Sequence, residues 1–223
     1  MCFSATASFA VSAGLIPVGV YCVYKVRLVN RAYWPFALYP LFFGIQQAAE
    51  GWLWLMLESG NMESIRLPAL SFVFFSHFFW LLWIPYSCFV IENSDNKKWY
   101  FFIMTITGCL FGLALYVPVL LFADWMTVSL IHQSISYELK LLFDDFVPRL
   151  AVRGAYVLII LIPLLSSSQK YLRYFGVIIA LSVLGTVLLY AETFISVWCF
   201  FAAVFSFYML YMIISLERQK AIH

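Results

Sequence analysis

The stretch YWPFALYPLFFGIQQAAEGWLWLML, from Tyr33 to Leu57, decides the fold class. It is long enough to cross the bilayer core, which takes about 20 predominantly apolar residues in a helix. It also carries Gln46, Gln47 and Glu50 within two helical turns. A charged carboxylate in mid-membrane costs about 2.5–3.5 kcal/mol on insertion scales, so chains keep one where it faces a protein interior or a wet cavity. The stretch therefore predicts a membrane helix that turns a polar face into a bundle.

The composition of the whole chain supports a membrane protein. Hydrophobic residues make up 65% of the 223 residues and charged residues only 11%, and the mean hydropathy is +0.94. A soluble domain has about 45–50% apolar and about 25% charged residues, so lipid must cover much of this apolar excess. The net charge of +2 is too small to indicate a nucleic-acid partner. We expect an all-α, polytopic membrane protein, folded as one bundle over residues 1–223, with the lipid bilayer as its main partner.

Apolar runs along the chain predict seven transmembrane helices. All have roughly the length that a bilayer crossing needs except the fifth, which is short. The predicted spans are residues 4–24, 33–57, 67–91, 99–122, 150–165, 173–190 and 194–215.

The basic residues predict the orientation of this bundle. Nine of the 13 Lys and Arg residues fall on one side of the predicted membrane, namely Lys25, Arg27, Arg31, Lys97, Lys98, Lys170, Arg173, Arg218 and Lys220. The positive-inside rule then puts the C-terminus in the cytoplasm and the N-terminus outside. The long outer connection, residues 123–148, has apolar residues spaced partly at three and four. It is either an interfacial amphipathic helix, a lid over the bundle, or a packed interfacial loop.

The motif QQAAEG contains the strongest candidate site. Gln46 and Glu50 are four residues apart and Gln47 and Glu50 three apart, which puts the two amides and the carboxylate on one face of a helix. Such a face serves either as an ion, proton or ligand site or as a hydrogen-bond clamp between helices. Both interpretations stay open at the level of sequence.

His77 is a second candidate, in the middle of the span 67–91. It is either hydrogen-bonded to a neighbouring helix or acts as a metal ligand or proton-transfer group. In a regular helix, Ser76 beside it points to another face and is not an obvious partner. Cys2, His77 and Glu50 together form a possible zinc or copper ligand set, because thiolate, imidazole and carboxylate all suit these metals.

Arg153 is the third candidate, because it belongs to the short span 150–165. A span of full thickness would draw this arginine into the outer membrane zone, where a buried guanidinium needs a carboxylate partner. Glu50 and Glu192 are the candidates on that side, and the alternative is that Arg153 snorkels to the interface. Common depth then predicts one outward-open polar pocket, with ligand-binding or ion-binding residues Gln46, Gln47, Glu50, His77, Arg153 and Glu192.

Two segments carry a family resemblance. The opening MCFSATASF, at Met1–Phe9, and PLFFGIQQAAEGW, at Pro40–Trp52, resemble a family of uncharacterised bacterial integral membrane proteins of unknown function. The resemblance implies a multi-span protein of the bacterial cytoplasmic membrane, with Gln46, Gln47 and Glu50 as family features. It implies no reaction.

Three functions fit these features. The first is binding or transport of a small ligand, proton or cation through the outward-facing pocket. The second is an intramembrane metal-dependent enzyme acting on lipid, with Cys2, His77 and a carboxylate at its centre. The third is a structural subunit that packs against another membrane protein or a second copy of the chain. Metal content separates the first two.

Overall fold

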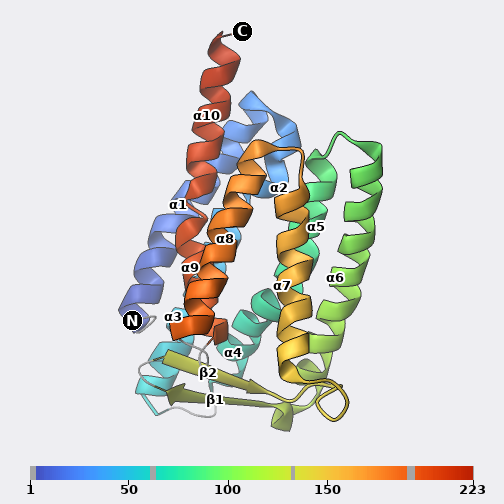
Figure 1. Ribbon diagram of the computed structural model, residues 1–223. Helices are drawn as coiled ribbons and strands as arrows, with labels where there is room; N and C mark the ends of the chain where they lie inside the picture. Colours follow the sequence, from blue (N-terminus) through green and yellow to red (C-terminus); the bar gives the residue numbers. More distant parts are fainter. Residues whose placement is uncertain (1–3, 61–63, 132–133, 190–193, 223) are drawn as a thin grey trace.

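The protein is a bundle of long helices with a two-stranded hairpin lying across one end (Figure 1). A computed structural model describes residues 4–60, 64–131, 134–189 and 194–222. The strands are β1 (Met126–Ile131) and β2 (Ser134–Leu139). In chain order the helices are α1 (Ala5–Val29), α2 (Trp34–Ala37), α3 (Tyr39–Glu58), α4 (Arg66–Val73), α5 (Trp80–Ile91), α6 (Asp95–Leu121), α7 (Arg149–Ser166), α8 (Lys170–Leu189), α9 (Phe194–Phe205) and α10 (Tyr208–Ile222).

Six helical stretches in the described residues are long and apolar enough to cross a membrane, which identifies a membrane protein. They correspond to six of the seven predicted spans, with α4 and α5 forming one stretch and α9 and α10 another. Their bounds are Ala5–Val29, Arg66–Ile91, Asp95–Leu121, Arg149–Ser166, Lys170–Leu188 and Phe194–Lys220.

Helix α3 corresponds to the remaining predicted span but is not one of these six. Gln46, Gln47 and Glu50 lower its hydropathy, although it has 20 residues. It packs tightly along α1, because glycines let the two backbones approach. A Cβ atom added at Gly19 would lie 2.5 Å from the backbone nitrogen of Leu41. The polar face of α3 is therefore held inside the bundle.

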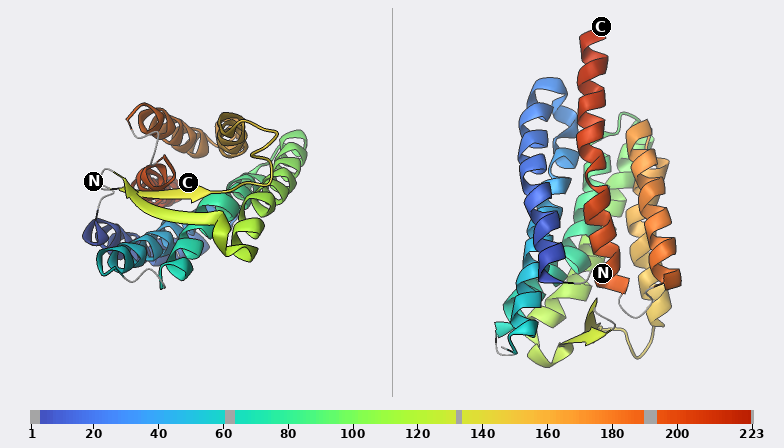
Figure 2. Two further views of the ribbon diagram at one scale, coloured as in Figure 1. Left: turned by 90° about the horizontal axis from the view of Figure 1, so that it is seen from below. Right: turned by 90° about the vertical axis from the view of Figure 1, so that its left-hand side faces the viewer.

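The connection between α6 and α7 adds a two-stranded hairpin to the predicted helical bundle. Within residues 123–148, strands β1 and β2 pair antiparallel, with Met126 opposite Leu139 and Ile131 opposite Ser134. The view along the bundle shows this hairpin crossing the ends of the helices (Figure 2). In SISYEL the apolar residues Ile135, Tyr137 and Leu139 alternate with polar ones, which is the period of a strand. All residues of β2 except Glu138 are buried. Of the three alternatives for residues 123–148, the amphipathic helix is wrong, because the segment 126–139 forms paired strands.

Polar contacts join the helix ends at the opposite end of the bundle, where the C-terminus lies (Figure 1). Lys25 of α1 forms a 2.7 Å ion pair with Glu217 of α10. Glu92, directly after α5, accepts a 2.9 Å hydrogen bond from the backbone nitrogen of Ser168 in the α7–α8 turn. Lys97 of α6 donates to the carbonyl of Ser166. We call this the loop end of the bundle, and the other the hairpin end.

Candidate binding site

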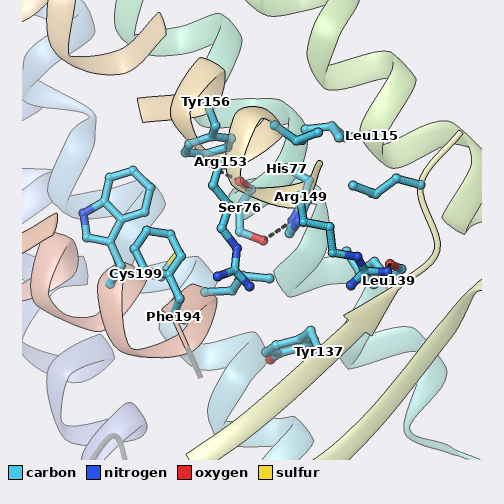
Figure 3. A pocket seen from close by; sticks show the side chains of 14 residues that line it. Ser76, His77, Leu115, Tyr137, Leu139, Arg149, Arg153, Tyr156, Phe194 and Cys199 are labelled. Carbon is cyan, nitrogen blue, oxygen red and sulfur yellow. Dashed lines mark hydrogen bonds between the residues drawn. The ribbon is translucent and has the colours of Figure 1, made fainter. Parts of the chain in front are cut away.

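A cavity of about 100 Å³ lies at the hairpin end, where the hairpin meets α7, α9 and the turn between α4 and α5 (Figure 3). Most of its lining is apolar, and a few polar groups converge on it, as is usual for small-molecule sites. Its polar lining comes from three separate parts of the fold, the turn between α4 and α5, strand β2 and helix α7. These side chains are Ser76, His77, Tyr137, Arg149, Arg153 and Tyr156.

A π-helical turn, Phe74–Phe79, presents Ser76 and His77 to this cavity. Successive residues rotate less about the axis of a π-helix than about that of an α-helix, and such turns are frequent at functional sites. The Ser76 Oγ atom lies 2.9 Å from His77 Nδ1. The expectation that Ser76 is not a partner of His77 is therefore wrong. Tyr156 of α7 also reaches the turn and donates a 2.5 Å hydrogen bond to the carbonyl oxygen of Ser76.

Arg153 projects from α7 into the cavity. Its guanidinium carbon lies 5.7 Å from the centre of the Phe194 ring, a cation–π contact, and Figure 3 shows the group between Phe194 and Tyr137. Glu50 is not its partner, because no ion pair joins these two described residues. Glu192, the other predicted partner, lies outside the described residues.

Arg149, one turn earlier in α7, is differently placed. It donates to a carboxylate oxygen of Asp144 at 3.0 Å and to the carbonyl oxygen of Leu139 at 3.0 Å. It thereby ties α7 to the end of β2. Its charge is already paired, whereas Arg153 has no ion-pair partner among the described carboxylates.

An open groove of about 590 Å³ lies between the hairpin and α7 and shares Arg149, Arg153, Tyr137 and Leu139 with the cavity. The rest of its lining includes Thr127, Glu138 and Lys140 of the hairpin strands and their flank. We call this groove the vestibule. The arginines stand at the boundary between vestibule and cavity.

The polar face of α3 forms a separate, buried hydrogen-bond cluster. Glu50 is fully buried and accepts from Ser196 Oγ at 2.5 Å and from Gln47 Nε2 at 3.2 Å. Gln46 Oε1 accepts from Trp80 Nε1 at 2.7 Å. The prediction that these three residues share a helical face agrees with these contacts.

The sequence predicted that this cluster and His77 line one pocket. His77 lines the cavity, but the cluster does not. Tyr137 and Cys199 line the cavity, and both interact electrostatically with Glu50. The carboxyl group therefore lies behind the cavity wall. The physical reason is the helix α9, which supplies both Ser196 to the cluster and Cys199 to the wall.

Tyr137 is a functional candidate that the sequence reasoning missed. Burial raises the pKa of its phenol well above the usual value, with a further contribution from the nearby Glu50, so the group stays protonated and can donate. Within the described part of the chain its hydroxyl has no hydrogen-bond partner. The sequence pattern that could have identified Tyr137 is the alternation of polar and apolar residues in SISYEL, which puts Tyr137 on the inner face of a strand.

The predicted zinc or copper set cannot be assembled from the described residues. Cys2 lies outside them, and within them no group of three or more His, Cys, Asp or Glu side chains comes close enough to hold a metal ion. His77 and Glu50 remain the two described members of that set. The metal hypothesis therefore stays a prediction.

Comparison with protein families adds one finding. A model of a family of unknown function, DUF6629, matches residues 1–222. The chain belongs to this family. No curated protein and no solved structure matches this DUF6629 member. Its function is therefore argued from its own residues.

Proposed function

We propose that this protein crosses the membrane seven times and binds a small anionic ligand that enters from the hairpin end. The 20 residues of α3 and its packing along α1 support a seventh crossing, because the polar triad that lowers its hydropathy is buried in the bundle. Basic residues are concentrated at the loop end, which supports a cytoplasmic loop end and an external hairpin. The bacterial cytoplasmic membrane fits this arrangement.

The observation that carries the proposal is the guanidinium of Arg153 in the cavity. Arg153 is exposed where the cavity meets the open vestibule, so an anion in the groove can reach its guanidinium. Arg153 has only the face of Phe194 and no ion pair among the described residues. An anion entering through the vestibule would supply the opposite charge, with the Tyr137 hydroxyl as a second donor. This charge favours an anion over the proton or cation that the sequence left open.

The buried cluster then has a supporting role. Glu50 links α3 to α9 through Ser196, and α9 carries Trp198 and Cys199 of the cavity wall. The cluster thereby fixes one wall of the binding site. Glu50 acts as a positioning residue, since it does not line the cavity.

A thermal-shift titration in zwitterionic nanodiscs tests the anion site, with acetate as the probe against gluconate at equal ionic strength. A ligand at ten times its Kd stabilises the folded state by about 1.4 kcal/mol, so acetate should raise the Tm of the wild type more than gluconate does. Arg153→Gln should lose this difference. Arg66→Gln is the matched control, because Arg66 is also at the hairpin end but bonds the Leu120 carbonyl. An equal acetate response in both variants would contradict the proposal.

A further inference from the structure

A second, smaller cavity of about 30 Å³ lies next to the first one, deeper in the bundle. The two share Tyr156, Trp198 and Cys199. The remainder of its lining is apolar and comes from α3, α5, α7, α8 and α9. This lining includes Phe43, Ile84, Ile160, Phe175, Ile179 and Ala202. We call it the inner cavity.

The three spaces form a series in which polarity falls with distance from the hairpin. The vestibule is lined by charged and polar groups, including Glu138 and Lys140. The first cavity has a cation, Arg153, on mainly apolar walls. The inner cavity has almost no polar surface. A ligand that matches this series has a charged head and a hydrocarbon tail.

We propose that the ligand is a small amphiphilic carboxylate, with its head at Arg153 and a short hydrocarbon chain passing Tyr156 and Trp198 into the inner cavity. This inference rests on the proposed anion site and names its substrate class. The charge balance favours a monoanion, because Arg149 is already paired with Asp144 and leaves one unpaired guanidinium among the described arginines at the cavity.

The cavity volumes decide the size of the tail. An apolar cavity of about 150 Å³ is enough to hold one benzene molecule. The first cavity of about 100 Å³ and the neighbouring inner cavity of about 30 Å³ together fit a head group and a few carbons. They do not fit two acyl chains, so the space favours a free short-chain acid over a diacyl lipid.

Affinities of acetate, butyrate and hexanoate for the protein in phosphatidylcholine nanodiscs test the tail. At neutral pH all three acids are ionised, so they differ only in chain length. Burial of each methylene should tighten binding roughly fourfold until the space is filled. Hexanoate should bind on the order of tenfold or more tightly than acetate. Hexan-1-ol, which has the same chain without the charge, should bind far more weakly than hexanoate.

Ala202→Leu tests whether the tail lies in the inner cavity. The larger side chain fills this space without touching Arg153, so acetate affinity should stay and the gain with chain length should disappear. Ala202→Val is the milder variant if the leucine disturbs folding. Ala13→Leu is the matched control, because Ala13 is exposed on α1, far along the chain from the cavity. It should keep both the acetate affinity and the gain with chain length.

The outcomes separate the two proposals. Equal affinities for the three acids, with binding still dependent on Arg153, would overturn the hydrocarbon tail and leave the anion site intact. Failure of every acid to bind, in wild type and Arg153→Gln alike, would overturn the anion site itself. Hexan-1-ol binding as tightly as hexanoate would overturn the charged head. Displacement of hexanoate by phosphatidate in the discs would assign the site to a lipid and overturn the small acid.

Discussion

Two charged side chains, Glu92 at the loop end and Arg153 at the hairpin end, are placed in opposite ways. At the loop end, Glu92 accepts hydrogen bonds from the backbone nitrogens of Asn93, Ser94 and Ser168, and Lys25 is paired with Glu217. At the hairpin end, Arg153 lies in a cavity with no ion pair to a described residue. Paired charges hold loops together, whereas an exposed cation without an ion pair among the described residues is available to a ligand.

The largest effect concerns which end faces outward, because its readout is all-or-none. Ser59, directly after α3, belongs to the hairpin end, and Ser94, directly before α6, to the loop end. In intact cells, a membrane-impermeant thiol reagent should label Ser59→Cys and not Ser94→Cys, with the wild type as background. Labelling of position 94 alone would reverse the orientation and put the arginine cavity in the cytoplasm.

The next effect is a loss of stability from the buried cluster. Glu50→Ala leaves Ser196 Oγ and Gln47 Nε2 without their acceptor and opens a void, which should lower the free energy of unfolding by about 3–5 kcal/mol. Glu58→Ala, at the exposed end of the same helix, should change it by less than about 0.5 kcal/mol. Denaturant unfolding in mixed micelles measures both. Equal effects would show that the cluster does not hold α3 to α9.

Glu92→Gln tests how much the hydrogen bonds of Glu92 stabilise the loop end, with a smaller expected effect than that of Glu50→Ala. The substitution weakens several charge-assisted hydrogen bonds and should cost about 1–3 kcal/mol at neutral pH. Asp95→Asn, exposed in the first turn of α6, is the control for loss of a negative charge. Its cost should stay below about 1 kcal/mol.

The stability difference between the wild type and Glu92→Gln should also depend on pH. Burial opposes ionisation of Glu92, but the hydrogen bonds from Ser168, Ser94 and Asn93 outweigh it and hold its pKa below the usual range. A carboxyl with a depressed folded-state pKa stabilises the protein above its unfolded pKa, near 4.3, and loses this contribution as the pH falls through the folded value. The stability difference between wild type and Glu92→Gln should therefore shrink below about pH 4. A constant difference would contradict this role.

The smallest expected changes in stability come from two tyrosines of the cavity, Tyr156 and Tyr137, whose substitutions by Phe form a matched pair. Tyr156→Phe removes the hydrogen bond to the Ser76 carbonyl and should cost about 1 kcal/mol. Tyr137→Phe removes a hydroxyl with no partner among the described residues, so stability should change by less than about 0.5 kcal/mol. Acetate affinity should fall instead, because a donor to the anion is lost. The reverse order of stability effects would mean that Tyr137, and not Tyr156, holds the cavity together.

What the sequence could predict depended on distance along the chain. The hydrogen bond between Gln47 and Glu50 follows from helical spacing. The short fifth span drew attention to Arg153, but the predicted pair with Glu50 does not form. Ser196, which lies 146 residues after Glu50, could not be found, because only packing brings α9 to α3. The hairpin was missed because its alternation competes with a partly helical spacing of apolar residues. The predicted roles of Cys2 and Glu192 lie outside the described residues.

Arginine modification from outside the cell tests the central claim most directly. Intact cells are treated with a membrane-impermeant arginine-directed dicarbonyl, and the modified peptides are quantified by mass spectrometry. Arg153 should react from the outside, and hexanoate should protect it, whereas reaction of Arg66 should be unaffected by hexanoate. An Arg153 that is unreactive from outside, or whose reaction is unchanged by hexanoate, would contradict an accessible anion site at the hairpin end.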